Sequence, residues 1–367
     1  MKLFILRIAI LFLIIRNVKM ADLSFYHTTD EIALKLDKLI SSNKCQNFSI
    51  EKHGSNEYKL ENTTIPLFFY DIKPKKPAEY QKKIFIIGGQ HARELISTEF
   101  LFHFVQTLCL PIAEKNQYLF NFSFRIIVNH NPIGRQIVEK GDYCNRLNGN
   151  KVDLNRNYDI AFGKFVESPN EENPGNEPAS EVETKFAIEI IKEFRPEMVI
   201  DIHSGSKALF YPWGYKNKKF RYYKPIKAFY KEVQKKYCKE CQIGLPVEVL
   251  GYKASGSLMD YSQKKLGVKY ALSWEIFEDP KAELSEAINE NTFRFKVLVK
   301  TKVSKIQKFK DKIRKNQFSA DKSFTKDENE ICFKMFNPST KEEYDNTIEK
   351  WIKMLNLFLK KYISLFK

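Results

Sequence analysis

His91, Glu94 and His203 are residues of the types that bind a catalytic zinc ion. His91 and Glu94, three residues apart, follow the apolar segment 84–89 (IFIIGG) after Gln90, and His203 ends a second apolar segment, 197–203 (EMVIDIH). Catalytic zinc commonly has three protein ligands and an open position for water. Alone, His-x-x-Glu also fits a surface pair on a loop, but two strand ends of the same kind favour one metal site.

The segments that carry these residues predict an α/β fold. Apolar runs typical of buried strands alternate with amphipathic stretches typical of helices, which indicates one domain with a mixed, mainly parallel, twisted sheet and helices on both faces. Ligands bind at the carboxyl ends of the strands in such sheets. The expected strands are 64–72, 83–89, 122–129, 197–204 and 269–277, and the expected helices are 26–40, 94–110, 180–194, 222–237 and 340–366. Ser180 and Glu183 predict a capping box for the third helix.

A fourth candidate residue, Glu275, lies in the expected strand ALSWEI. Ala271, Ser273 and Glu275 share one face of this strand because side chains alternate, and the apolar Leu272, Trp274 and Ile276 share the other. A carboxylate on a small, polar face suits a cleft wall, where it could act as a general base. The alternative interpretation is a glutamate that faces solvent.

Five motifs in this order resemble the zinc carboxypeptidases of the pancreatic and secreted type. They are His91-x-x-Glu94, NGNKVDLNRNYD (148–159), DIHSGS (201–206), GYKASGSLMDYSQ (251–263) and YALSWEIF (270–277). The resemblance covers residues 26–277 and extends to the last helix. It implies one Zn²⁺ per chain, held by His91, Glu94 and His203, with Glu275 as the catalytic carboxylate.

The resemblance also implies roles for further polar residues. Arg146 would stabilise the oxyanion of the reaction, and Arg93 would bind substrate. Asn155 and Arg156 would bind the terminal carboxylate of a peptide, since a guanidinium forms paired hydrogen bonds with a carboxylate. Tyr252 would cover the bound end group.

Met259 matches the base of the pocket for the terminal side chain. A methionine at this position predicts a preference for apolar or aromatic C-terminal residues, whereas an acidic residue would attract Lys or Arg. Asp260 is the next residue, and a shift of the match by one position would reverse the inference.

The N-terminus and the cysteines bear on the location of the protein. Residues 1–21 resemble a signal peptide, with an uncleaved anchor as the alternative, and residues 22–367 are expected to form the catalytic domain without a pro-domain. The six cysteines suit disulfides in a secreted protein. For Cys238-x-x-Cys241 we favour disulfides over a zinc or redox site. Three Asn-x-Ser/Thr triplets, at Asn47, Asn62 and Asn121, would be glycosylation acceptors.

The net charge of +16 could indicate an anionic partner. The lysines are spread along the chain, so we interpret them as solvated surface residues and expect no nucleic-acid binding. A Lys-rich insertion at about 281–330 could bind a polyanion or form a solvent-exposed surface segment. After leader removal we expect no stable membrane insertion, and we expect a monomer.

These observations predict a secreted zinc-dependent carboxypeptidase that acts on the C-termini of peptides and proteins. Two alternatives stay open: a metal-dependent hydrolase of the same fold that acts on N-acyl amino acids or cell-wall peptides, and a catalytically silent peptide-binding protein. Serine hydrolysis is disfavoured because the sequence has no G-x-S-x-G motif. The His-Glu-x-x-His pattern of other zinc peptidases is also absent.

Overall fold

The computed structural model describes residues 23–42, 44–60, 63–166, 171–279 and 326–364. The predicted leader (1–21) and most of the Lys-rich insertion (281–330) lie outside these ranges. Among the described residues, no single helix has the length and apolar composition to cross a membrane, although helices α3 (Leu95–Cys109) and η1 (Glu114–Asn121), bent by 110°, pass that test as a pair.

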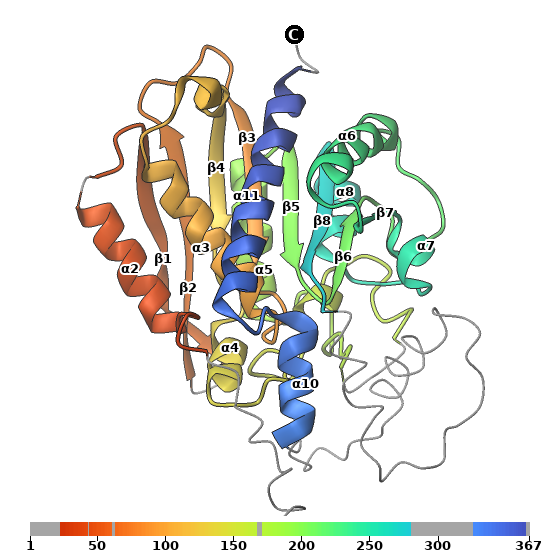
Figure 1. Ribbon diagram of the computed structural model, residues 1–367. Coiled ribbons are helices and arrows are strands. Elements are labelled where there is room, and N and C mark those ends of the chain that lie inside the picture. Colours follow the sequence, from red (N-terminus) through yellow and green to blue (C-terminus); the bar gives the residue numbers. More distant parts are fainter. Residues whose placement is uncertain (1–22, 43, 61–62, 167–170, 280–325, 365–367) are drawn as a thin grey trace, which may run out of the picture.

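An eight-stranded sheet forms the centre of the molecule, in the order β1-β2-β4-β3-β5-β8-β6-β7 (Figure 1). Strands β4, β3, β5 and β8 run parallel, while β1, β2 and β6 pair antiparallel with their neighbours β2, β4 and β8. The strands are β1 Phe48–Leu60, β2 Thr63–Pro74, β3 Lys82–Gly88, β4 Phe122–Ile127, β5 Met198–His203, β6 Ser206–Phe210, β7 Gln242–Gly244 and β8 Tyr270–Phe277.

Helices cover both faces of this sheet, which confirms the predicted α/β class. One face packs against α2 (Thr29–Ser41), α3 (Leu95–Cys109), α6 (Tyr223–Tyr237) and α11 (Lys341–Ser364). The other packs against α5 (Val182–Phe194) and α8 (Leu258–Lys264). The other helices among the described residues are α4 (Pro132–Glu139), α7 (Pro246–Leu250), α10 (Lys326–Phe336), η1 (Glu114–Asn121) and η2 (Leu154–Arg156).

Strand β3 shows why the apolar segments are continuous. Ile84 and Ile86 belong to the core on the α3 side, and Phe85 and Ile87 belong to the core on the α5 side. All four side chains are fully buried. A central parallel strand is covered on both faces, so it has no polar alternation. This burial fixes the strand rigidly beneath the turn that carries His91.

Two local predictions were incomplete or wrong. The capping box at Ser180 and Glu183 is wrong, because α5 has Glu181 as its N-cap without a side-chain cap bond. The Asn157 side-chain amide binds the Ser180 hydroxyl instead: its nitrogen donates to Ser180 Oγ, and its oxygen accepts from the Glu181 N–H. Strands β1, β6 and β7 were also not predicted. The sequence of β1, FSIEKHGSNEYKL, lacks a sustained apolar run, and β7 has only three residues.

Three disulfides connect all six cysteines, which confirms the disulfide interpretation. They join Cys45 to Cys109, Cys144 to Cys332 and Cys238 to Cys241. The Cys-x-x-Cys pair is therefore closed on itself at the end of α6.

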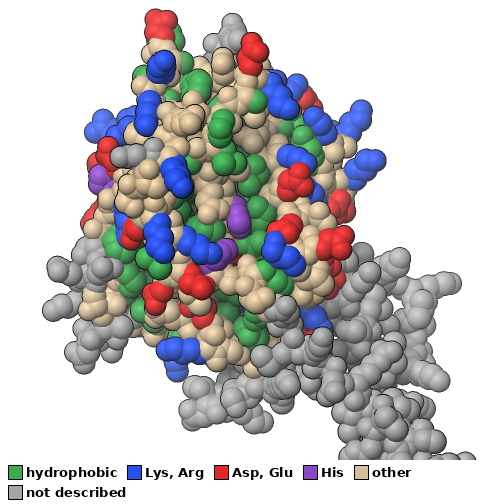
Figure 2. Space-filling model, turned by 60° about the vertical axis from the view of Figure 1, so that its left-hand side comes forward, with side chains coloured by type: hydrophobic (Ala, Val, Ile, Leu, Met, Phe, Trp, Pro, Cys, Tyr) green, Lys and Arg blue, Asp and Glu red, His purple; other side chains and the backbone are tan. Residues whose placement is uncertain are grey.

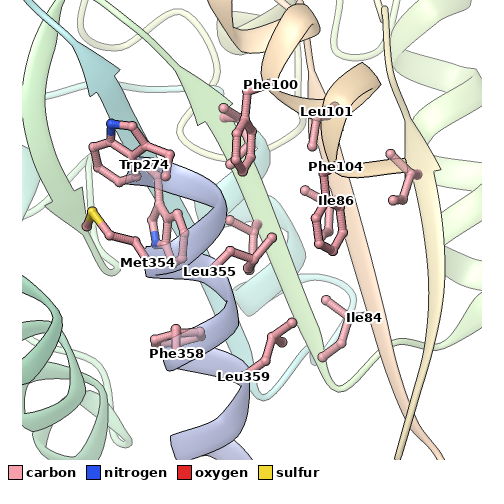
Figure 3. Close-up of a cluster of buried hydrophobic side chains, with 14 of the residues drawn as sticks. Ile84, Ile86, Phe100, Leu101, Phe104, Trp274, Met354, Leu355, Phe358 and Leu359 are labelled. Atoms are coloured by element: carbon pink, nitrogen blue, oxygen red, sulfur yellow. The ribbon is translucent and has the colours of Figure 1, made fainter. Parts of the chain in front are cut away.

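Helix α11 contributes large apolar side chains to the core on its face of the sheet. Trp274 of β8 contacts Phe358 of α11 edge to face, with ring centroids 5.4 Å apart. Leu355 lies in the same cluster (Figure 3) and is fully buried. Burial of these side chains removes apolar surface from water and stabilises the fold.

We predict that Leu355→Ala lowers the free energy of unfolding by about 2–5 kcal/mol, because it removes buried methyl groups and leaves a cavity. Leu34→Ala in α2 is the matched control, because this leucine is 53% exposed and should change stability by less than about 0.5 kcal/mol. Denaturant unfolding of both variants measures the difference. Equal losses would contradict the packing described here.

Candidate active site

The three predicted metal ligands converge at the carboxyl ends of two adjacent parallel strands. His91 and Glu94 lie in the turn between β3 and α3, and His203 is the last residue of β5. The Nδ1 atoms of His91 and His203 lie 3.1 Å apart. Glu94 lies 2.7 Å from His91 Nδ1 through Oε1 and 3.0 Å from His203 Nδ1 through Oε2. One potential ligand atom from each residue therefore lies within 4.8 Å of the other two.

Two aspartates hold the outer nitrogens of the imidazoles. His91 Nε2 lies 3.2 Å from Asp153 Oδ1, and His203 Nε2 lies 2.8 Å from Asp201 Oδ2. Gln90 Nε2 donates to the same Asp201 oxygen at 2.7 Å. A carboxylate at Nε2 fixes the ring orientation and leaves Nδ1 as the nitrogen available to a metal ion. The sequence analysis did not identify either aspartate, although Asp201 lies two residues before His203 and therefore on the same strand face.

The chemistry of this donor set fits zinc. Two imidazoles and one carboxylate are a frequent ligand set of catalytic zinc sites. Burial raises the pKa of Glu94, but the nearby His91 and His203 lower it more, so its net pKa lies below the ordinary value. Glu94 therefore stays ionised, as a metal ligand must be.

All ten predicted site residues line one cavity of about 520 Å³. Figure 2 shows histidine side chains in a hollow of this face, with charged side chains around it. The ten residues come from the β3–α3 turn, the loop after α4, η2, the end of β5, the segment 252–259 and β8: His91, Arg93, Glu94, Arg146, Asn155, Arg156, His203, Tyr252, Met259 and Glu275.

Strand β8 places Glu275 beside the metal ligands. Glu275 pairs in register with His203 of β5. Ser273 and Glu275 line the cavity, whereas Trp274 packs into the core against α11. The alternation predicted for this strand is confirmed, and it brings a carboxylate to the cavity wall.

Arg146 lies next to the candidate metal site. Its Nε and Nη2 donate to Asp153 Oδ2 at 2.9 and 2.8 Å, and its Nη1 lies 3.2 Å from His91 Nδ1. Asp153 thus contacts both an arginine and a histidine of the site. Burial raises the pKa of Asp153, but the charges of Arg146 and His91 lower it more, so the carboxylate stays ionised.

Each of the two other cavity arginines pairs with a glutamate that the sequence analysis missed. Arg93 donates to both carboxylate oxygens of Glu171, at 3.1 and 3.3 Å. Arg156 Nη2 donates to Glu172 Oε1 at 2.6 Å. Glu171 and Glu172 are adjacent in the sequence, but no sequence pattern indicates that they lie beside these arginines. Within the described chain, the buried Nε of Arg156 has no acceptor.

Met259, rather than Asp260, faces the cavity. Met259 is among the lining residues, and Asp260 is not. Asp260 is fully buried and accepts the N–H groups of Gly214 and Tyr215 at 2.9 and 3.0 Å. Burial raises the pKa of Asp260 to about 7, despite these hydrogen bonds. The aspartate therefore anchors the 214–215 backbone in this structure.

Helix α10 forms a cavity wall that the sequence analysis did not assign. Cys332, Met335 and Phe336 line the cavity, and Cys332 is bonded to Cys144, two residues before Arg146. Ser204 Oγ donates to the Phe336 carbonyl oxygen at 2.7 Å. A Cβ atom at Gly205 would lie 2.5 Å from the Phe336 ring, so this close contact requires glycine.

The fold and the buried His/Glu/His set define the class: an α/β protein with a group of residues that could hold a metal ion. The family model described as zinc carboxypeptidase matches residues 46–294, and the chain belongs to this family.

Two curated relatives show the extent of the similarity. Zinc carboxypeptidase A 1 of Anopheles gambiae is 26% identical over 280 residues, which cover 70% of this chain and 61% of that protein. Carboxypeptidase B of Astacus astacus is 26% identical over 273 residues, which cover 70% of this chain and 87% of that protein. The chain spans 61% to 64% of the lengths of several carboxypeptidase A relatives.

Solved structures support the fold. Bovine thrombin-activatable fibrinolysis inhibitor, in complex with tick carboxypeptidase inhibitor, matches with a TM-score of 0.66 and 18% identity over 92% of this chain and 98% of that chain. Carboxypeptidase A of Helicoverpa armigera matches with a TM-score of 0.60 and 19% identity over 69% of this chain and 66% of that chain.

We predict that Asp201→Asn weakens zinc binding by about 10- to 100-fold, because it removes the charged partner of His203 Nε2. Competition with a chromophoric chelator measures the affinity. Asp159→Asn is the control, because Asp159 is exposed and pairs with Lys265 at the surface. If both variants bound zinc equally well, Asp201 would not hold the ligand as described.

Proposed function

We propose that this protein is a zinc-dependent carboxypeptidase that hydrolyses the last peptide bond of peptides and proteins. The observation that carries the proposal is the shared cavity: a three-ligand metal site, a strand carboxylate and arginines for an oxyanion and a carboxylate all line it. The family membership of the chain supports the same reaction.

His91, Glu94 and His203 would hold the zinc ion. When bound, the ion would lower the pKa of a water molecule and polarise the scissile carbonyl group. Glu275 is the general base in this proposal: it takes the proton of the attacking water and returns it to the leaving amine. Its place in register with His203 supports this role.

Arg146 would stabilise the negative charge that develops on the carbonyl oxygen. A guanidinium held in place before the reaction stabilises an oxyanion without reorganisation. The two hydrogen bonds from Arg146 to Asp153 hold the arginine next to His91, so its orientation does not depend on the substrate.

Arg156 and Asn155 would bind the terminal carboxylate, with Arg93 as a further substrate contact and Tyr252 as the cover of the end group. A buried N–H without an acceptor is costly, so the unpaired Nε of Arg156 among the described residues supports an anionic ligand at this position. Such a ligand must share Arg156 with Glu172.

Met259 would contact the terminal side chain, which favours an apolar or aromatic residue. The hydrogen bonds that hold Asp260 against the 214–215 backbone support this assignment. We further propose that the protein is secreted, because its three disulfides are typical of oxidising compartments.

We predict that Glu275→Gln lowers kcat/KM for a peptide by about 10²- to 10⁴-fold, the usual contribution of a general base, without loss of zinc. Mass spectrometry of a peptide that loses one C-terminal residue measures the rate, and metal analysis measures the zinc. The exposed Glu189→Gln is the control and should keep full activity. Unchanged activity in Glu275→Gln, or wild-type cleavage that survives zinc removal, would contradict the proposal.

We also predict that, in a peptide panel that varies the last residue, the wild-type enzyme releases Phe and Leu faster than Lys and Arg. Met259→Asp should reverse this order, because a carboxylate in an apolar pocket attracts a cationic side chain. Release rates for each peptide provide the measurement. A wild-type preference for Lys and Arg would contradict the assignment of Met259.

A further inference from the structure

Segment 216–239, which includes helix α6, is strongly basic, and the proposed reaction does not use its positive charges. It contains ten Lys or Arg residues and one acidic residue, Glu232. None of these ten cations lines the cavity of the candidate active site. This segment therefore has a local excess of positive charge, although lysines occur along the whole chain.

On α6, the lysines form a row along the exposed side. Lys224, Lys227, Lys231 and Lys235, here called the α6 lysine row, follow the three- and four-residue spacing of one helix face. The opposite face is buried in the core through Ile226, Phe229, Tyr230 and Val233. At about 1.5 Å per residue, the row extends over roughly 16 Å. The lysines near its start, with Lys219 and Tyr223, line a shallow depression of the surface.

The absence of ion pairs distinguishes this row from an ordinary solvated helix face. In α11, Lys341 and Lys353 pair with acidic residues four positions away. Within the described chain, no lysine of the α6 lysine row forms an ion pair. The acidic neighbours Glu232 and Glu240 instead pair with lysines of α11.

Repulsion within the row favours an anionic partner. Lys227, Lys231 and Lys235 are spaced by four residues, and like charges at this spacing destabilise a helix. A linear polyanion would relieve the repulsion and release counterions on binding. The three disulfides are typical of oxidising compartments, and the proposed secretion would bring the protein to sulfated polysaccharides outside the cell.

We propose that the exposed face of α6 binds a sulfated polysaccharide, with the α6 lysine row contacting successive sulfate groups. This surface would hold the protein on an anionic matrix while the active-site cavity stays open to peptides.

Binding of the full chain to heparin, measured across a range of salt concentrations, tests the proposal. The row variant Lys224→Gln/Lys227→Gln/Lys231→Gln/Lys235→Gln should bind at least about 10-fold more weakly, and its affinity should depend less on salt. The control variant removes four exposed lysines elsewhere and therefore has the same net charge: Lys35→Gln/Lys76→Gln/Lys115→Gln/Lys192→Gln.

Equal losses in both variants would overturn the proposal, because net charge alone would then explain binding. Tighter binding of wild-type protein to a DNA duplex than to heparin at the same salt would overturn the assigned partner. Lysine acetylation of the wild-type protein is an independent readout that requires no variant. Heparin should protect the α6 lysine row and leave Lys35 and Lys76 reactive, and uniform reactivity would contradict the proposal.

Discussion

The proposed chemistry depends on the convergence of two imidazoles and one carboxylate at the ends of adjacent parallel strands. His91 Nδ1, His203 Nδ1 and the Glu94 carboxylate lie within about 3 Å of one another. All three side chains are buried, and the loss of water from such polar groups is costly unless hydrogen bonds or a metal ion compensate for it. The cores on both sides of β3 and β5 hold the strands in place, so the ligands are positioned by the rigid part of the fold.

The charges around this centre form an ordered set of pairs. Asp153 and Asp201 contact the outer nitrogens of the two histidines, and Asp153 also holds Arg146. Glu171 and Glu172 pair with Arg93 and Arg156. A buried charge is stable only when it is paired, and these acids keep the arginines and histidines ordered in a cavity that water can enter. In the proposed reaction, a substrate carboxylate would enter a cavity whose cations already have fixed positions.

The sequence predicted those elements whose buried residues are apolar and recur with the period of a strand or a helix. Strands β3 and β5 are recognisable as continuous apolar segments because both of their faces are buried. Helix α11 is recognisable as an amphipathic segment because one stripe of its surface is buried. The ten site residues were found through the order of their motifs, and all of them line one cavity. The shared cavity brings these residues together, and the role of each residue is a proposal.

The missed features depend on long-range contacts that no local pattern encodes. Glu171 and Glu172 lie in a polar loop whose position relative to the arginines follows from the packed fold. Helix α10 reaches the cavity through Cys332, 188 residues after Cys144. The charged face of α6 is not evident from the distribution of lysines along the chain, because it depends on their spacing along one side of the helix.

Zinc K-edge X-ray absorption on the purified protein, combined with metal analysis, tests whether His91, Glu94 and His203 share one ion. We expect one zinc ion per chain, bound by two imidazole nitrogens and carboxylate oxygen, and loss of that ion in His203→Ala. A protein that binds no zinc, or whose zinc has sulfur ligands and persists in His203→Ala, would contradict this expectation.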